Sequence, residues 1–152
     1  RVLALYRKLE NLPLGTRLFA FLVCLRAPYF GSIHPRFHIF RPGHVLVSMR
    51  KRRQVENHIR SVHALAMGNL CELAAGTMME ATVPSHLRWI PRGMNIEYLK
   101  PARSDVSAEA RLEKTRWPGK EDVQVPVVVK DVQGEVVVRA VITMHVSPRP
   151  QN

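Results

Sequence analysis

One acidic residue, Glu72, lies in the middle of an otherwise apolar stretch. Residues 67–76 read Met-Gly-Asn-Leu-Cys-Glu-Leu-Ala-Ala-Gly, and no lysine or arginine occurs within four residues of Glu72 on either side. A carboxylate that is buried without a cation is costly, and such groups cluster at functional sites. Glu72 is therefore a candidate for catalysis, with a hydrogen-bonded structural role as the alternative.

Two further candidates lie shortly before this stretch. Asn57 precedes His63 by six residues, and His63 stands where the apolar pattern of a long helix begins. Backbone N–H groups at a helix N-terminus lack intrahelical partners and favour negative charge. The N–H of Ala64 is therefore a candidate donor to the oxygen of a polarised carbonyl group, and the Asn57 amide could add a second donor or orient a water molecule.

The spacing of these candidates predicts how a site must be assembled. Glu72 lies nine residues after His63, which is about 13.5 Å of helical rise. Its carboxylate therefore cannot reach a carbonyl group held at the start of its own helix. We expect a site shared across a two-fold dimer, with Asn57 and Ala64 from one subunit and Glu72 from the other.

The elements that position these residues follow from the hydrophobic pattern. Residues 63–80 are apolar on nearly every face, which is typical of a helix buried on all sides. Short helices are expected at 2–9 and 16–25, the second beginning at Thr16 as N-cap. Strands are expected at 36–40, 44–49, 86–90, 94–100, 106–117, 122–132 and 135–146. Because one apolar helix can be covered only by a sheet that wraps around it, we predict an α+β fold with one long buried central helix and a curved antiparallel sheet.

Length and composition indicate one domain. The chain has 152 residues, and we expect a single domain over 1–152, with an N-terminal helical extension at 1–30 and a core at 35–146. The two cysteines, Cys24 and Cys71, are too few for a disulfide scaffold or a cysteine zinc site. No metal site is expected, and the histidines of the first two strands are interpreted as surface or core residues.

The positive charge is concentrated in the first part of the chain. The formal net charge is +11; residues 1–60 hold 12 basic and 2 acidic residues, and the rest hold 11 and 10. A basic half suggests a polyanionic partner, which could be nucleic acid, an anionic membrane surface or a phosphorylated cofactor. No zinc-finger, helix-turn-helix or ribonucleoprotein motif accompanies it. Segment 16–25 is expected to pack on a sheet as a lid, with contact to a membrane surface as the alternative.

The motif around Asn57 resembles a known family. Residues 57–64, Asn-His-Ile-Arg-Ser-Val-His-Ala, followed by Glu72, resemble the Asn-x5-His-Gly…Asp/Glu pattern of hotdog-fold acyl-CoA thioesterases. Residues 93–102, Gly-Met-Asn-Ile-Glu-Tyr-Leu-Lys-Pro-Ala, are similar to the strand that follows in that family, including its Tyr-x-x-Pro-Ala ending. The resemblance covers about 35–146 and is closest to a bacterial branch with an N-terminal helical extension.

The resemblance implies a hotdog fold and a mechanism. The residue matching Glu72 acts in that family as a general base for water or as the nucleophile on the thioester. The residues matching Asn57 and the Ala64 N–H hold the carbonyl oxygen, and His63 shapes the turn. Many relatives carry Gly where this chain has Ala64. The implied protein is an acyl-CoA thioesterase that acts on a fatty or aryl substrate as a dimer or a dimer of dimers.

Four basic residues flank the second motif and could bind the phosphates of coenzyme A. They are Arg88, Arg92, Lys100 and Arg103. Coenzyme A would enter as part of the substrate, and no separate cofactor is expected. We expect neither a nucleic-acid partner nor contact with a membrane surface, and the absence of a recognisable signal peptide makes a cytoplasmic location the default.

Two other functions can be considered on the same fold, and the sequence favours the first over the second. Residues 89–92, Trp-Ile-Pro-Arg, lack the hydroxyl that some relatives use to orient water. This favours, as the alternative, a non-catalytic acyl-CoA or lipid-binding module. Hydration of an enoyl thioester usually requires an Asp-x4-His motif, which does not occur in residues 50–80.

Overall fold

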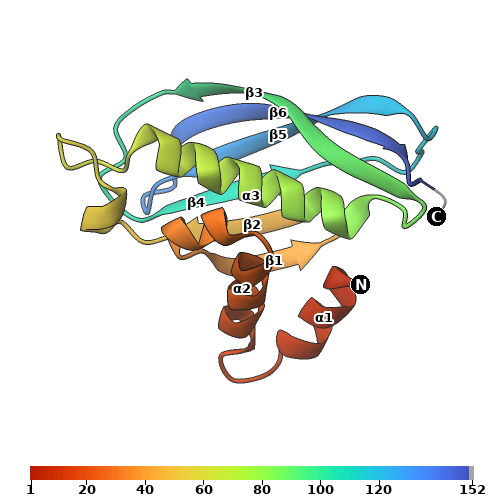
Figure 1. Cartoon of the computed structure of the whole chain (residues 1–152). Helices are drawn as coiled ribbons and strands as arrows, with labels where there is room; N and C mark the ends of the chain where they lie inside the picture. The colour runs from red at the N-terminus through yellow and green to blue at the C-terminus, as the bar shows by residue number, and fades with distance from the viewer. Residues whose placement is uncertain (151–152) are drawn as a thin grey trace.

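The computed structural model, which describes residues 1–150, is a six-stranded antiparallel sheet curved around one long helix (Figure 1). The helices are α1 (Val2–Leu9), α2 (Gly15–Arg26), α3 (Ala64–Thr82) and the short 3-10 helices η1 (Pro28–Ile33) and η2 (Arg53–Val55). The strands are β1 (Arg36–Arg41), β2 (His44–Met49), β3 (Leu87–Tyr98), β4 (Val106–Arg111), β5 (Glu121–Lys130) and β6 (Val136–Pro148). The order in the sheet is β1-β2-β4-β5-β6-β3, so β1 and β3 are the two edges.

The sheet and α3 form the core, and this confirms the predicted α+β architecture with a central helix. Buried and exposed residues alternate along β4 and β5, which is typical of strands with one covered face. The inner face carries mostly Val and Ala, whose small side chains let α3 lie close to the sheet. A helix on the concave face of a curved sheet is the arrangement of the hotdog fold.

The N-terminal extension packs on the β1 edge through aromatic side chains. Phe37 and Phe40 are three residues apart and would point to opposite faces of a regular strand. A bulge between Phe37 and Ile39 turns both rings inwards. Phe19 of α2 lies 5.1 Å from Phe37 and 5.0 Å from Phe40, and Tyr6 of α1 lies 4.9 Å from Phe19, measured between ring centroids. The second helix therefore packs on the sheet, as expected.

Three expected boundaries differ from the structure. The strands expected at 86–90 and 94–100 are one strand, β3, interrupted by a bulge between Pro91 and Gly93. Proline lacks the N–H that a ladder requires, and a bulge accommodates it. The strand expected at 106–117 ends at Arg111, before the turn residues Pro118 and Gly119. Helix α2 begins at Gly15 rather than after a Thr16 cap.

We predict that Phe19→Ala lowers the free energy of unfolding by about 3–5 kcal/mol, because Phe19 is fully buried among three aromatic rings. Phe21→Ala, two residues along the same helix, is the matched control. Its ring is 58% exposed, and its loss should cost less than about 0.5 kcal/mol. Urea denaturation of both variants is the measurement. Equal losses would show that α2 is not held by the aromatic cluster.

Candidate active site

The loop before α3 is organised by the side chain of Asn57. Asn57 Oδ1 accepts hydrogen bonds from the backbone N–H groups of Ile59 and Ser61, both at 3.1 Å. Asn57 Nδ2 donates to the Ser61 hydroxyl at 2.8 Å. Residues Glu56 and Val62 pair as an isolated antiparallel bridge and close the base of the loop. The Asn57 amide therefore holds the loop with its oxygen and one N–H, which leaves its second N–H available as a donor.

The start of α3 presents a free backbone donor. His63 is the N-cap, and its Nδ1 accepts from the Leu65 N–H at 3.1 Å. The N–H of His63 bonds to the Val55 carbonyl at 2.7 Å. Between these two satisfied groups, the Ala64 N–H has no acceptor within residues 1–150. The structure thus places His63 and Ala64 at the N-terminus of α3, and Asn57 in the loop that leads into it.

Glu72 is exposed in the single chain, which corrects the expectation that it is buried. Its side chain makes no hydrogen bond or ion pair with any described residue. Most of α3 is buried, but Leu65, Glu72 and Glu80 form an exposed line along it. The sequence pattern could not show that Glu72 is exposed. The neighbouring glycines count as apolar in the pattern, but they have no side chains that could cover the carboxylate.

Two glycines flank Glu72 and set how closely β3 approaches. A Cβ atom at Gly76 would lie 3.1 Å from the Trp89 ring, and one at Gly68 would lie 3.6 Å from Met94 Cε. Gly68 and Gly76 each lie four residues from Glu72, so all three share one face of α3. Their even spacing is the signal in the sequence that could have predicted this close approach. Glu72 therefore lies where α3 meets the unpaired edge strand.

The catalytic candidates fall into two separate groups within one chain. Because α3 is unbroken from Ala64 to Thr82, Glu72 lies eight residues, or about 12 Å, from the Ala64 N–H along the helix axis.

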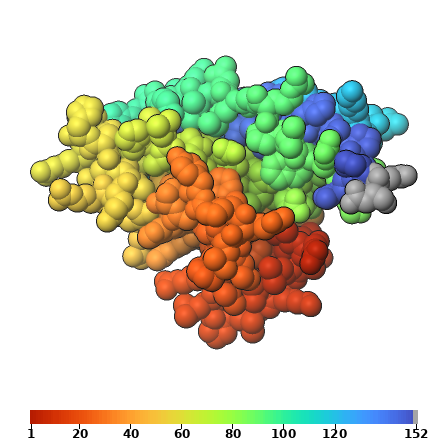
Figure 2. All heavy atoms as spheres, in the orientation of Figure 1, coloured from red at the N-terminus to blue at the C-terminus, as the bar shows by residue number. Residues whose placement is uncertain are grey.

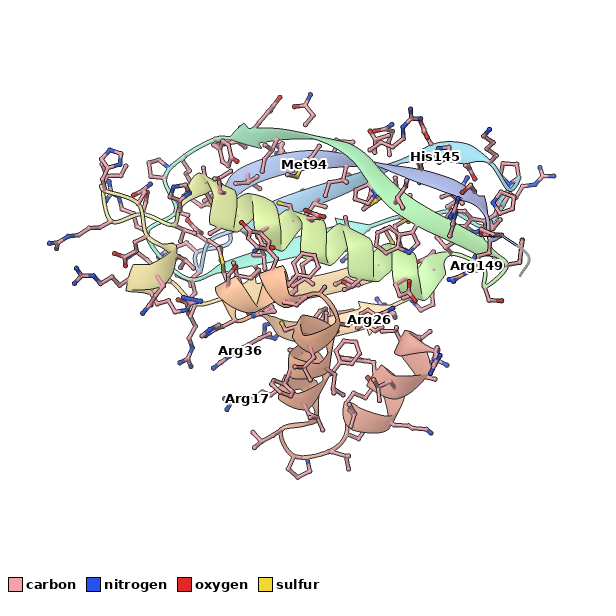
Figure 3. The ribbon with its side chains drawn as sticks, viewed as in Figure 1. Arg17, Arg26, Arg36, Met94, His145 and Arg149 are labelled. Carbon is pink, nitrogen blue, oxygen red and sulfur yellow. The ribbon has the colours of Figure 1, made fainter. Side chains whose placement is uncertain are left out.

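Beside Glu72, β3 pairs with β6 on one side and has no partner among the described residues on its other side. Met94 and Tyr98, on the face of β3 that carries the helix contacts, are 42% and 45% exposed. Figure 3 marks Met94 on this edge.

Of the four basic candidates, only Arg103 lies at the Asn57 loop. Its guanidinium donates to the Ile59 carbonyl at 3.4 Å. Arg92 pairs with Asp122 at 3.0 Å, and Lys100 contacts Asp131 and Glu135. Arg88 donates to Ser147 at the opposite end of β3. The structure therefore does not gather these side chains around Asn57 within one chain.

Two ionisable groups near Glu72 stay protonated at neutral pH. Burial raises the pKa of the Cys71 thiol to about 12, which removes it as a nucleophile. Burial, with a smaller contribution from Cys71, raises the pKa of Tyr98. The Tyr98 hydroxyl, 4.0 Å from the position of a Cβ at Gly68, therefore remains a hydrogen-bond donor on the Glu72 face.

A shallow hollow of about 610 Å³ lies away from Asn57, Ala64 and Glu72, on the outer face of the sheet, and is lined by Asn95, Gln124, Arg139 and other residues. In residues 1–150, no three His, Cys, Asp or Glu side chains converge as metal ligands. Over the same range, no helix is long and apolar enough to cross a bilayer.

The chain belongs to the family described as a domain of unknown function, DUF4442, whose model matches residues 15–146. The solved genomics protein APC5556 is 42% identical, with a TM-score of 0.85 over 97% of this chain and 98% of its own. A Pseudomonas aeruginosa protein of unknown function, named a probable thioesterase, is 26% identical, with a TM-score of 0.79 over 91% of this chain and 97% of its own.

More distant structures share the fold. A thioesterase from Haemophilus influenzae is 13% identical, with a TM-score of 0.71 over 82% of this chain and 85% of its own. No curated protein matches the chain. The hotdog fold expected from the two motifs is therefore confirmed by solved structures that carry it.

We predict that Asn57→Ala lowers the free energy of unfolding by about 1–2 kcal/mol, because two loop N–H groups lose their acceptor. Asn57→Asp keeps that acceptor and should cost less than half as much. Urea denaturation of both variants tests this. Equal stability of the wild type and the alanine variant would show that the side chain does not organise the loop.

Proposed function

We propose that the protein hydrolyses an acyl thioester of coenzyme A, with each active site shared between two copies of the chain. The observation that carries the proposal is that the chain holds a free Ala64 N–H at the start of α3, after the loop that Asn57 organises, and an exposed carboxylate, Glu72, that the same chain cannot bring to it. The likeness to the probable thioesterase from Pseudomonas aeruginosa supports the reaction class.

In the proposed mechanism, the thioester carbonyl oxygen lies at the start of α3. The Ala64 N–H and the free N–H of the Asn57 amide stabilise the negative charge that develops on this oxygen. His63 positions the donor by capping the helix. Water attacks the carbonyl carbon as Glu72 of the second copy takes its proton, the C–S bond breaks, and the coenzyme A thiolate leaves and is protonated. In the alternative course, the Glu72 carboxylate attacks first and water then cleaves the resulting anhydride.

The second copy would pair along the β3 edge. This edge exposes apolar side chains and an unpaired strand of 12 residues, a combination that natural proteins usually cover. Antiparallel pairing of two β3 strands would extend the sheet and bring the Glu72 face of each α3 against the other copy. The apolar space for the acyl chain would then form between the two copies.

For the coenzyme A phosphates, the geometry favours Arg103 among the four basic candidates. It reaches the Asn57 loop and has no carboxylate partner in the described part of the chain. Arg92 and Lys100 are neutralised by carboxylates, and they would have to exchange partners to bind phosphate. As proposed ligands for the coenzyme A phosphates, Arg88, Arg92 and Lys100 therefore come after Arg103.

We predict that Glu72→Gln lowers kcat for acyl-CoA hydrolysis by on the order of 10²–10⁴, the usual contribution of a positioned general base. The measurement is release of free coenzyme A from short, long and aromatic acyl-CoAs. Glu80→Gln is the matched control, because Glu80 is exposed on the same face of the same helix. It should retain full activity.

Two results would contradict this proposal in different ways. Unchanged turnover in Glu72→Gln would assign the carboxylate a structural role. If the wild type releases no coenzyme A but binds a non-hydrolysable thioether analogue, the protein is a binding module on the same fold.

We also predict that the wild type is dimeric at micromolar concentration and that Met94→Lys weakens the dimer. A charge placed at the centre of the β3 edge would have to be desolvated on pairing. Val132→Lys is the control, because Val132 is 64% exposed in the turn between β5 and β6. Mass measurement by light scattering over a concentration series distinguishes the variants. A fully active wild-type monomer would exclude the shared site.

A further inference from the structure

The outer face of α2 carries a row of exposed apolar side chains. Leu18, Phe21 and Leu25 are spaced by three and four residues, which places them on one face of the helix, and Leu14 is the exposed N-cap residue that precedes it. In the same order, their exposed fractions are 47%, 58%, 61% and 68%. The opposite face, with Phe19 and Ala20, is buried against the body. We call the four exposed residues the α2 ridge.

The α2 ridge lies on a part of the molecule that projects from the body. Figure 1 shows the pair α1–α2 extending away from α3 and the sheet, with the connecting turn at its tip. Figure 2 shows the same atoms as a protrusion. The turn contains the exposed polar residues Glu10 and Asn11, but its second part is apolar, since Leu12 is 54% exposed beside Pro13 and Leu14. Surface turns are usually polar, so this tip is a second sign of an apolar partner.

The charge around the α2 ridge is predominantly positive. Residues 11–55 contain eight basic residues and no Asp or Glu. Arg17 precedes Leu18 on the helix, Arg26 follows Leu25 at its end, and Arg36 begins β1. None of the three forms an ion pair with residues 1–150. Figure 3 labels these three arginines at this end of the molecule.

We propose that the α2 ridge docks the protein on the surface of an anionic lipid bilayer. Helices that lie in a bilayer interface combine an apolar face of Leu and Phe with flanking basic residues, and they bind by apolar burial together with attraction to anionic headgroups. The ridge and its arginines have this composition. Tyr29, 74% exposed just beyond α2, adds an aromatic side chain suited to the headgroup level.

A second copy of the chain fits the α2 ridge less well. A two-fold contact through the same surface would bring the arginines of one copy against those of the other. Glu10 is the one acidic residue among residues 1–55, so the extension offers little charge to offset this repulsion. The ridge is also at the β1 edge, whereas the proposed dimer uses the β3 edge. The inference therefore does not depend on the proposed function.

The test is co-sedimentation of the full chain with vesicles of phosphatidylcholine alone and with added phosphatidylglycerol. We expect binding to the anionic vesicles, little binding to the neutral ones, and loss of binding as salt is raised to about 0.5 M. The double variant Phe21→Ser/Leu25→Ser should bind at least about tenfold more weakly. Val132→Ser, an exposed apolar residue far from α2, is the matched control and should bind as the wild type does.

A second variant keeps the test decisive even if the serine variant folds poorly. Phe21→Trp should show a blue shift of its tryptophan emission on addition of anionic vesicles, and Trp89 and Trp117 in the wild type provide the background. Unchanged binding of the serine variant, or no blue shift from the introduced tryptophan, would overturn the proposal. A lower oligomeric mass of the serine variant would also overturn it, and would assign the ridge to a contact between copies.

Discussion

The rise of an unbroken α-helix is the constraint on which the candidate site depends. With about 1.5 Å per residue, the eight residues from Ala64 to Glu72 keep a helix-start donor and a mid-helix carboxylate about 12 Å apart. Neither the loop before α3 nor the sheet behind it can shorten that distance. Within one chain the two groups of candidate residues therefore lie apart, and both Glu72 and the β3 edge are exposed, which is what the proposed shared site requires of each copy.

The rest of the fold positions these two groups of candidate residues. Asn57 closes the loop that delivers the chain to the helix start, and His63 caps the helix without using the Ala64 N–H. Further along, Gly68 and Gly76 allow β3 to lie close to α3 on both sides of Glu72. The bulge between Pro91 and Gly93 lets one long strand continue past this point. The two glycines and the bulge therefore let β3 pack closely on α3 and still leave space for the Glu72 side chain between them.

Much of this arrangement could be predicted from local pattern. The apolar run 63–80 identified α3, the valine-rich alternation identified β5 and β6, and the spacing of Ala64 and Glu72 predicted that one helix keeps them apart. The exposure of Glu72 could not be predicted, because the neighbouring glycines look apolar in sequence and yet have no side chains that could cover the carboxylate. The positions of Arg88 and Arg92 also required the structure, since their strand register relative to β6 decides which face they occupy.

The central claim, that each active site uses residues of two copies, is tested most directly by mixing two inactive variants. Glu72→Gln lacks the carboxylate, and Asn57→Asp keeps the loop but lacks the amide donor. After unfolding and refolding together in equal amounts, half of the randomly assorted dimers are mixed, and each mixed dimer holds one intact site. The shared-site account predicts recovery of about a quarter of the wild-type activity. No recovery, with mixed dimers shown to form by mass, would contradict it.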